Sequence, residues 1–196
     1  MGKSRIWQTV ADGEILYLPH FIAKDEADLL LSQLQDQVAW QQRSIFLFGK
    51  SIPQPRLTAW YSDKSYRYSG LTLNPTPMPS TIIELQRRCE SACQHTFNSV
   101  LLNLYRDGKD SMGWHQDNEI ELGVNPIIAS LSLGATRTFA LKHIHSGDSI
   151  RFELSHGALL VMGGTLQHYW KHALPKSKRI LSPRINLTFR NINELE

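Results

Sequence analysis

Two side chains that can bind a metal stand two positions apart in the segment Gly113-Trp-His-Gln-Asp117. If this segment is a strand, His115 and Asp117 project from the same face, because side chains alternate across a strand. One imidazole, one carboxylate and one further neutral donor form the triad that holds Fe(II) and leaves positions open for oxygen and a co-substrate. The pattern alone is weak, since an exposed loop histidine beside an acid is the commoner explanation of such a tripeptide.

The residues themselves leave the third donor open. His168 and His172 both lie in the segment Gln167-His-Tyr-Trp-Lys-His172, and His143 and His145 form a further candidate pair. Spacing within one sequence does not rank His168 above His172. Most of the histidines in the chain are expected to be structural or exposed.

The segment Arg184-Ile-Asn-Leu-Thr-Phe-Arg190 alternates polar and apolar residues, as a strand with one polar face does. If the polar face is the interior one, Arg184 and Arg190 are buried, and a buried guanidinium needs an anion. Its planar fork pairs well with a carboxylate, so a dicarboxylic small molecule is a natural ligand. The alternative is that the apolar face is the buried one and the arginines face water.

Neutral hydrogen-bonding groups occur upstream, in Leu101-Leu-Asn-Leu-Tyr105. On a strand, Asn103 and Tyr105 share one face between apolar neighbours. They therefore offer an amide and a phenol to the same ligand.

Positive charge is concentrated in two segments, residues 41–70 and 170–190, although the formal net charge is only +3. The first segment also carries six aromatic side chains, among them Phe48, Tyr66 and Tyr68. Cations interleaved with aromatic rings suit phosphate contact and base stacking. A solvated loop whose aromatic rings cover the core is an equally good explanation of this composition.

The elements that would position these groups follow from periodicity. Residues 24–38 and about 81–95 are predicted to be helices, the first with acids in its opening turn and the second beginning at a capping box, Thr81-Ile-Ile-Glu84. From residue 99 onward the pattern has period two, which predicts strands over residues 99–106, 127–133, 136–142, 158–162 and 184–190. Residues 49–80 are rich in glycine and proline and are expected to form a long irregular excursion.

These elements predict one α+β domain over residues 1–196, in which N-terminal helices pack outside a two-sheet jelly roll, the double-stranded β-helix. With 196 residues, 41% hydrophobic and 20% charged, the composition is ordinary for such a domain. No apolar stretch is long enough to span a bilayer or act as a secretory signal, so we expect a cytoplasmic protein with no membrane partner. Cys89 and Cys93 are expected to be buried thiols rather than a disulfide.

The motifs Asn103-x-Tyr105, His115-x-Asp117, His172 and Arg184-x-Asn-x-Thr-x-Arg190 occur in an order that resembles the AlkB family of Fe(II)- and 2-oxoglutarate-dependent dioxygenases. The resemblance runs from about Phe48 to Arg190. The segments Phe48-Gly-Lys50, Tyr68-Ser-Gly-Leu-Thr-Leu73 and His172-Ala-Leu-Pro175 are most similar to the members that act on duplex DNA. The resemblance implies Fe(II) as cofactor, with 2-oxoglutarate and O₂ as co-substrates.

Residue by residue, the resemblance implies that His115, Asp117 and His172 bind iron and that His168 is structural. It implies that Arg184 pairs with the distal carboxylate of 2-oxoglutarate, assisted by Tyr105 and Asn186. Asn103 and Arg190 would lie near the carboxylate that chelates iron. For the damaged base, it implies stacking on Tyr68, polar contacts from Tyr66 and Glu119, and Phe48 as a wedge that fills the gap left by an extruded base.

The activity implied by the resemblance is oxidative demethylation of 1-methyladenine and 3-methylcytosine in DNA, a direct-reversal repair that releases formaldehyde, succinate and CO₂. Residues 41–80 would then be a nucleotide-recognition segment and residues 99–190 the catalytic core. The expected partner is DNA, with RNA as an alternative, and the expected state is a monomer, cytoplasmic or, in a eukaryote, nuclear. A related oxygenase acting on RNA or protein is the main alternative, and a non-catalytic nucleic-acid binding module is a remote one.

Overall fold

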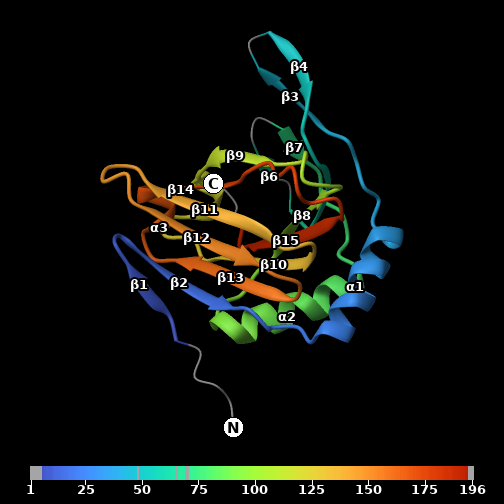
Figure 1. Ribbon diagram of the computed structural model, residues 1–196, viewed down its shortest axis with the longest axis horizontal. Helices are drawn as coiled ribbons and strands as arrows, with labels where there is room; N and C mark the ends of the chain where they lie inside the picture. The colour runs from blue at the N-terminus through green and yellow to red at the C-terminus, as the bar shows by residue number, and fades with distance from the viewer. Residues whose placement is uncertain (1–5, 48, 65, 69–70, 194–196) are drawn as a thin grey trace.

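The structure, a computed structural model, describes residues 6–47, 49–64, 66–68 and 71–193 (Figure 1). Its largest element is a seven-stranded antiparallel sheet with strand order β1-β2-β13-β10-β15-β8-β5. In that order the strands are Gln8–Val10, Gly13–Leu18, Ala158–Gly163, Ile128–Gly134, Arg184–Arg190, Ser99–Tyr105 and Leu57–Ser62. The N-terminal strands β1 and β2 thus lie at one edge of the sheet, and the C-terminal strand β15 is an internal strand between β10 and β8.

A second antiparallel sheet has four strands in the order β12-β11-β14-β9. These are Ser149–Leu154, Arg137–His143, Trp170–Leu174 and Met112–His115. Large apolar side chains of both sheets, such as Trp60 and Leu101 on one side and Phe139 and Trp170 on the other, share one core cluster. The two sheets therefore face each other across a common interior, which is the jelly roll that the strand pattern predicts.

Two helices cover the other face of the large sheet, α1 over Lys24–Gln37 and α2 over Ser80–Cys93 (Figure 1). Asp25 and Glu26 lie in the first turn of α1, where acids interact favourably with the helix dipole. The buried side chains of α2 are spaced as one helix face and pack on the outward apolar side chains of the sheet. The predicted fold, with helices outside a jelly roll, is confirmed.

One local prediction was wrong. Thr81 does not open the second helix as a capping box, because the N-cap is Pro79 and no side chain caps the helix. The helix begins at Ser80, so Thr81 is already its second residue and cannot occupy the N-cap position that a capping box requires. The helix ends at Cys93, and Cys89 and Cys93 are buried thiols that form no disulfide, as expected.

The segment between α1 and α2 contains two small hairpins besides β5. They are formed by β3 with β4 and by β6 with β7, over Ser44–Leu47, Lys50–Pro53, Tyr66–Tyr68 and Leu71–Leu73. The β3–β4 hairpin projects from the body of the molecule (Figure 1). The short helices are the 3₁₀ turn Ile120–Leu122 and α3 over Leu166–Tyr169. None of the helices in the described part of the chain is long and apolar enough to cross a membrane.

Candidate metal and dicarboxylate site

The candidate metal-binding side chains come from the small sheet and the loop that follows its edge strand. His115 ends β9 and pairs in register with His172 of β14. Asp117 lies two residues beyond the strand, where its backbone N–H donates to Oε1 of Gln167 at 2.9 Å. Because Gln167 belongs to α3, this short helix fixes the loop so that Asp117 turns back toward the two histidines.

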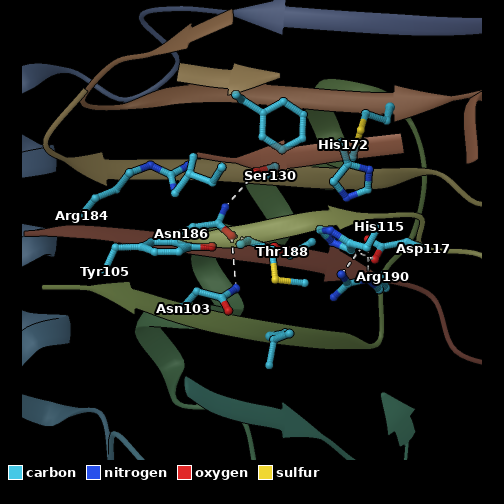
Figure 2. A pocket seen from close by; sticks show the side chains of 15 residues that line it. Asn103, Tyr105, His115, Asp117, Ser130, His172, Arg184, Asn186, Thr188 and Arg190 are labelled. Atoms are coloured by element: carbon cyan, nitrogen blue, oxygen red, sulfur yellow. Dashed lines mark hydrogen bonds and ion pairs between the residues drawn. The ribbon is translucent and has the colours of Figure 1, made fainter. Parts of the chain in front are cut away.

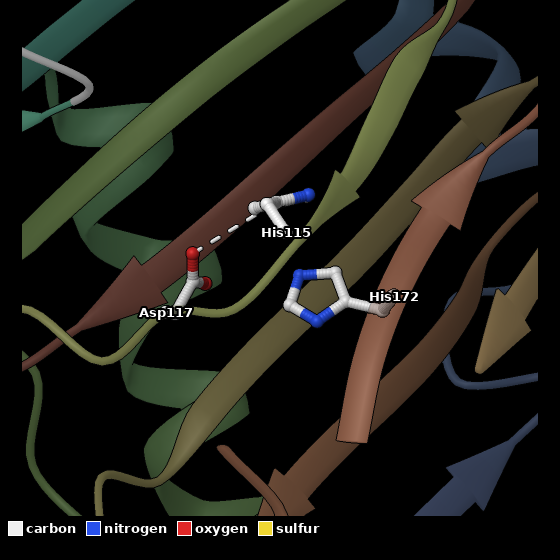
Figure 3. A group of neighbouring side chains, drawn as sticks. All are labelled: His115, Asp117 and His172. Atoms are coloured by element: carbon white, nitrogen blue, oxygen red, sulfur yellow. Dashed lines mark ion pairs between the residues drawn. The ribbon is translucent and has the colours of Figure 1, made fainter. Parts of the chain in front are cut away.

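One ligand atom from each of His115, Asp117 and His172 lies within 4.8 Å of the other two (Figure 3). Asp117 and His172 are buried, and the His115 side chain is 23% exposed. Among the described residues this is the only such group of three metal-binding side chains. The sequence could not choose between His168 and His172, and the structure brings His172 to the cluster.

The two oxygens of Asp117 have different surroundings. Oδ2 accepts hydrogen bonds from Arg190, from Nη2 at 2.7 Å and from Nε at 3.2 Å, whereas the buried Oδ1 has no hydrogen-bond partner among the described residues. Burial would raise the pKa of Asp117, but the positive charge of Arg190, with contributions from the neighbouring imidazoles of His172 and His115, outweighs it and holds that pKa at about 2. The carboxylate is therefore ionised at neutral pH, with one oxygen available to a cation.

Both imidazoles are neutral at neutral pH, as metal ligands must be. Burial is the largest cause in each case: it lowers the pKa of His115, and it lowers that of His172 to about 3, because protonation of His172 is further disfavoured by the neighbouring His115. Nδ1 of His115 lies 2.9 Å from the carbonyl oxygen of Gly113, which places the proton there and leaves Nε2 as the free donor. The buried Nδ1 of His172 has no hydrogen-bond partner in the described part of the chain. These unpaired atoms fit a bound cation.

The opposite end of the same cavity is built around Arg184 (Figure 2). This guanidinium is buried, donates from Nη2 to Oγ of Ser132 at 2.8 Å, and lies over the Tyr105 ring at 5.4 Å from the ring centroid. Its Nε has no hydrogen-bond partner and no carboxylate pairs with it among the described residues. Burial lowers the pKa of Arg184 to about 10, which still leaves it charged at neutral pH. A buried cation of this kind fits an incoming carboxylate.

Amide and hydroxyl groups connect the two ends. Asn186 donates from Nδ2 to Oγ of Ser130 at 2.8 Å, and its Oδ1 accepts from Oγ1 of Thr188 at 2.8 Å and Nδ2 of Asn103 at 3.3 Å. All four side chains line the cavity. The polar face of β15 therefore lies in the interior, and the alternative in which its arginines face water is excluded by their burial.

Arg56 belongs to this site and was not identified from the sequence. It precedes β5, is 3% exposed, and donates from Nε to Oδ1 of Asn103 at 2.7 Å. The sequence shows it only as one cation among several in a basic segment, and no local pattern distinguishes a buried arginine from an exposed one. Gln167, whose side chain accepts a hydrogen bond from the backbone of Asp117, was also not identified, because no local pattern shows that this glutamine is buried.

The remaining predicted residues are placed less centrally. His168 lies outside the cavity, with Nε2 against the carbonyl oxygen of Val124, so it is not part of the metal-binding cluster. Glu119 is half-buried and precedes the 3₁₀ turn, beyond the residues that line the cavity. Phe48 and the side chains of Tyr66 and Tyr68 lie outside the part of the chain that the structure describes.

Comparison with known proteins gives consistent matches. The model of the 2OG-Fe(II) oxygenase superfamily matches residues 14–190. The chain is 45% identical over 184 residues to the alpha-ketoglutarate-dependent dioxygenase alkB homolog 3 of Mus musculus, covering 89% of this chain and 64% of that protein. It is 37% identical over 204 residues to the DNA oxidative demethylase ALKBH2 of Mus musculus, covering 97% of this chain and 85% of that protein.

The solved structure of OsALKBH1 superposes with a TM-score of 0.66 at 16% identity, covering 95% of this chain and all of that one, which supports the fold alone. The chain spans slightly less than two thirds of the length of its alkB homolog 3 relatives, 64% of the mouse and human proteins. Its match to the mouse ALKBH2 protein covers 85% of that protein, and the superfamily model matches most of this chain. The resemblance read from the sequence motifs is confirmed, and the chain belongs to the AlkB family of the 2OG-Fe(II) oxygenase superfamily.

Proposed function

We propose that this protein is an Fe(II)- and 2-oxoglutarate-dependent dioxygenase that removes methyl groups from N-alkylated bases in DNA. The observation that supports this most strongly is that one buried cavity contains both metal-ligand atoms without hydrogen-bond partners and a guanidinium without a carboxylate partner among the described residues. At one end are the unpaired donor atoms of Asp117 and His172, and at the other is the carboxylate-free guanidinium of Arg184. A metal ion and a dicarboxylate together match both ends.

In this proposal His115, Asp117 and His172 hold the ferrous ion, and Arg184 binds the distal carboxylate of 2-oxoglutarate with Tyr105 and Asn186. When bound, iron and 2-oxoglutarate supply the oxidation of an N-methyl group by O₂, with release of succinate and CO₂. The hydroxymethyl group so formed on the base leaves as formaldehyde, because the ring nitrogen is a good leaving group.

The protein's own contribution is positioning. Arg190 fixes Oδ2 of Asp117 through two hydrogen bonds, which leaves Oδ1 facing the two imidazoles. Asn103, held by Arg56, keeps an amide beside Asn186 at the middle of the cavity. No protein nucleophile or acid is required, since the oxidised carbon leaves without protein attack.

Nucleic acid as substrate is supported by the relatives, because the ALKBH2 proteins are named DNA oxidative demethylases. In this proposal residues 41–80, including the projecting β3–β4 hairpin, contact the strand, and Phe48 acts as the wedge. Tyr66, Tyr68 and Glu119 contact the base. An extruded base costs a few kcal/mol of stacking and pairing, and a methyl group that blocks pairing reduces that cost.

The test adds Fe(II), 2-oxoglutarate and O₂ to methylated single-stranded and duplex oligonucleotides and follows product mass and succinate together. We expect loss of one methyl group per succinate in the presence of the lesion. Succinate without loss of the methyl group would contradict a nucleic-acid substrate. We expect Phe48→Ala to reduce turnover of duplex far more than of single strands, and equal reduction of both would remove the wedge assignment.

A further inference from the structure

The outer face of the four-stranded sheet carries an exposed aromatic ring directly beside the metal site. Trp114 is 52% exposed although it is the neighbour of His115 on β9. Because side chains alternate along a strand, Trp114 faces away from the cavity that His115 lines. It borders a hollow of about 320 Å³ whose other walls are Lys142, Lys171, Ile144 and the buried ring of His143.

The hollow is strongly positive. Lys142 of β11 and Lys171 of β14 are exposed and lie directly opposite each other in the antiparallel register. Neither ammonium makes a hydrogen bond or ion pair among the described residues. Like charges in such a pair destabilise a sheet, and an anion bound between them relieves the repulsion. In the remaining wall, Nε2 of His143 lies 3.1 Å from Oδ2 of Asp12.

The position of Trp114 connects the hollow to the cavity. β9 is the edge strand of its sheet, so no further strand separates its inner face from its outer face. The side chain of His115 is 23% exposed at this edge, and the Cα atoms of consecutive residues are about 3.8 Å apart. A polynucleotide with one base in the cavity can therefore pass over the edge and present a neighbouring nucleotide to Trp114.

We propose that this hollow binds a nucleotide of single-stranded nucleic acid flanking the methylated base, with its base stacked on Trp114 and its phosphates between Lys142 and Lys171. An indole with paired cations is the combination that binds single strands without sequence preference. An acidic peptide would use the lysines but would gain little from the exposed ring. The proposal rests on the proposed function, which places a nucleotide in the neighbouring cavity.

The first experiment measures binding of an unmethylated single strand by fluorescence anisotropy, without iron or 2-oxoglutarate. Trp114→Ala should weaken the affinity about ten-fold, and Trp114→Phe, which retains a stacking ring, should recover most of it. The double variant Lys142→Gln, Lys171→Gln should reduce the slope of log affinity against log salt by about 1.4, or 0.7 for each phosphate. Lys24→Gln, on α1, is the matched control and should change neither quantity.

The second experiment compares turnover of a methylated mononucleotide, which has no flanking nucleotide, with that of a longer single strand. Trp114→Ala should raise KM for the long strand about ten-fold and leave kcat and the mononucleotide KM unchanged. Equal losses on both substrates would overturn the proposal, because they would mean that Trp114 supports His115 instead of the strand. Unchanged strand affinity in Trp114→Ala would overturn it as well. So would a result in which polyglutamate displaces the strand and strand affinity falls in the double lysine variant but not in Trp114→Ala.

The two proposals fail separately. If the wild-type protein demethylates the oligonucleotides but Trp114→Ala binds strands as well as the wild type does, the hollow is not a nucleotide site and the proposed activity is still supported. If the wild-type protein demethylates nothing but Trp114→Ala binds strands more weakly than the wild type, the nucleotide site in the hollow is supported and the proposed activity is wrong.

Discussion

Replacing Asp117 by Ala tests two proposed roles of this carboxylate, as a metal ligand through Oδ1 and as the ion-pair partner of Arg190 through Oδ2. Oδ2 accepts two hydrogen bonds from Arg190, and Oδ1 faces the histidines without a hydrogen-bond partner among the described residues. The substitution therefore removes a metal ligand and also the carboxylate of a buried ion pair. The second effect does not need a metal, so it is visible in protein kept in chelator.

The magnitude follows from burial. Asp117 is 1% exposed and Arg190 is 3% exposed, so the guanidinium that loses its carboxylate cannot reach solvent. Breaking a buried pair by removal of one partner costs about 3–5 kcal/mol of unfolding free energy. For a chain of this size that corresponds to a fall of about 6–20 °C in the thermal midpoint.

The assay is urea unfolding of the metal-free wild type, Asp117→Ala, Arg190→Met and the double variant. We expect each single variant to be destabilised and the double variant to lose less than the sum, because the second substitution removes the charge stranded by the first. The double variant should recover stability but not Fe(II) binding, measured by titration. A loss below about 1 kcal/mol in Asp117→Ala, or strict additivity, would refute the view that Oδ2 belongs to a buried ion pair.

Three further results are expected. Arg184→Met should raise KM for 2-oxoglutarate about 10- to 100-fold, because a charge-assisted pair contributes about 1.5–3 kcal/mol; an unchanged KM would place the dicarboxylate elsewhere. His172→Gln should abolish Fe(II) binding while His168→Gln leaves it intact, and the opposite pattern in a metal titration would exchange their roles. Gly108→Ala would place a Cβ 1.9 Å from the carbonyl oxygen of Ser177, so we expect a lower thermal midpoint by calorimetry, and an unchanged one would contradict that close packing.

The features that could be predicted from sequence are those with a period. The alternation in residues 184–190 gave both the strand and its polar face, and the structure buries both faces. Ile185 and Leu187 pack toward the helices, while Arg184 and Asn186 line the cavity. Helix positions followed from apolar spacing in the same way, because burial of one face imposes that spacing.

Features that depend on contacts between distant segments could not be predicted. Arg56 is buried because β5 pairs with β8, which brings its guanidinium to Asn103 from 47 residues away. Gln167 holds Asp117 across 50 residues. The capping box failed for a local reason, since the helix begins one residue earlier than the motif predicts and Thr81 lies inside it.

The two arginines of β15 differ in a way that supports the proposed position of the dicarboxylate. They are six positions apart on one strand, so their Cα atoms are separated by about 20 Å, and both are buried. Arg190 is paired with Asp117, whereas among the described residues Arg184 contacts the Ser132 hydroxyl and the Tyr105 ring and no carboxylate. A carboxylate entering the cavity therefore gains most at Arg184, because at Arg190 it would compete with a buried anion already hydrogen-bonded there. In the proposed function, one strand thus supplies Arg190 to hold the metal ligand Asp117 and Arg184 to bind the co-substrate, and the pairing of Arg190 with Asp117 directs the dicarboxylate to Arg184.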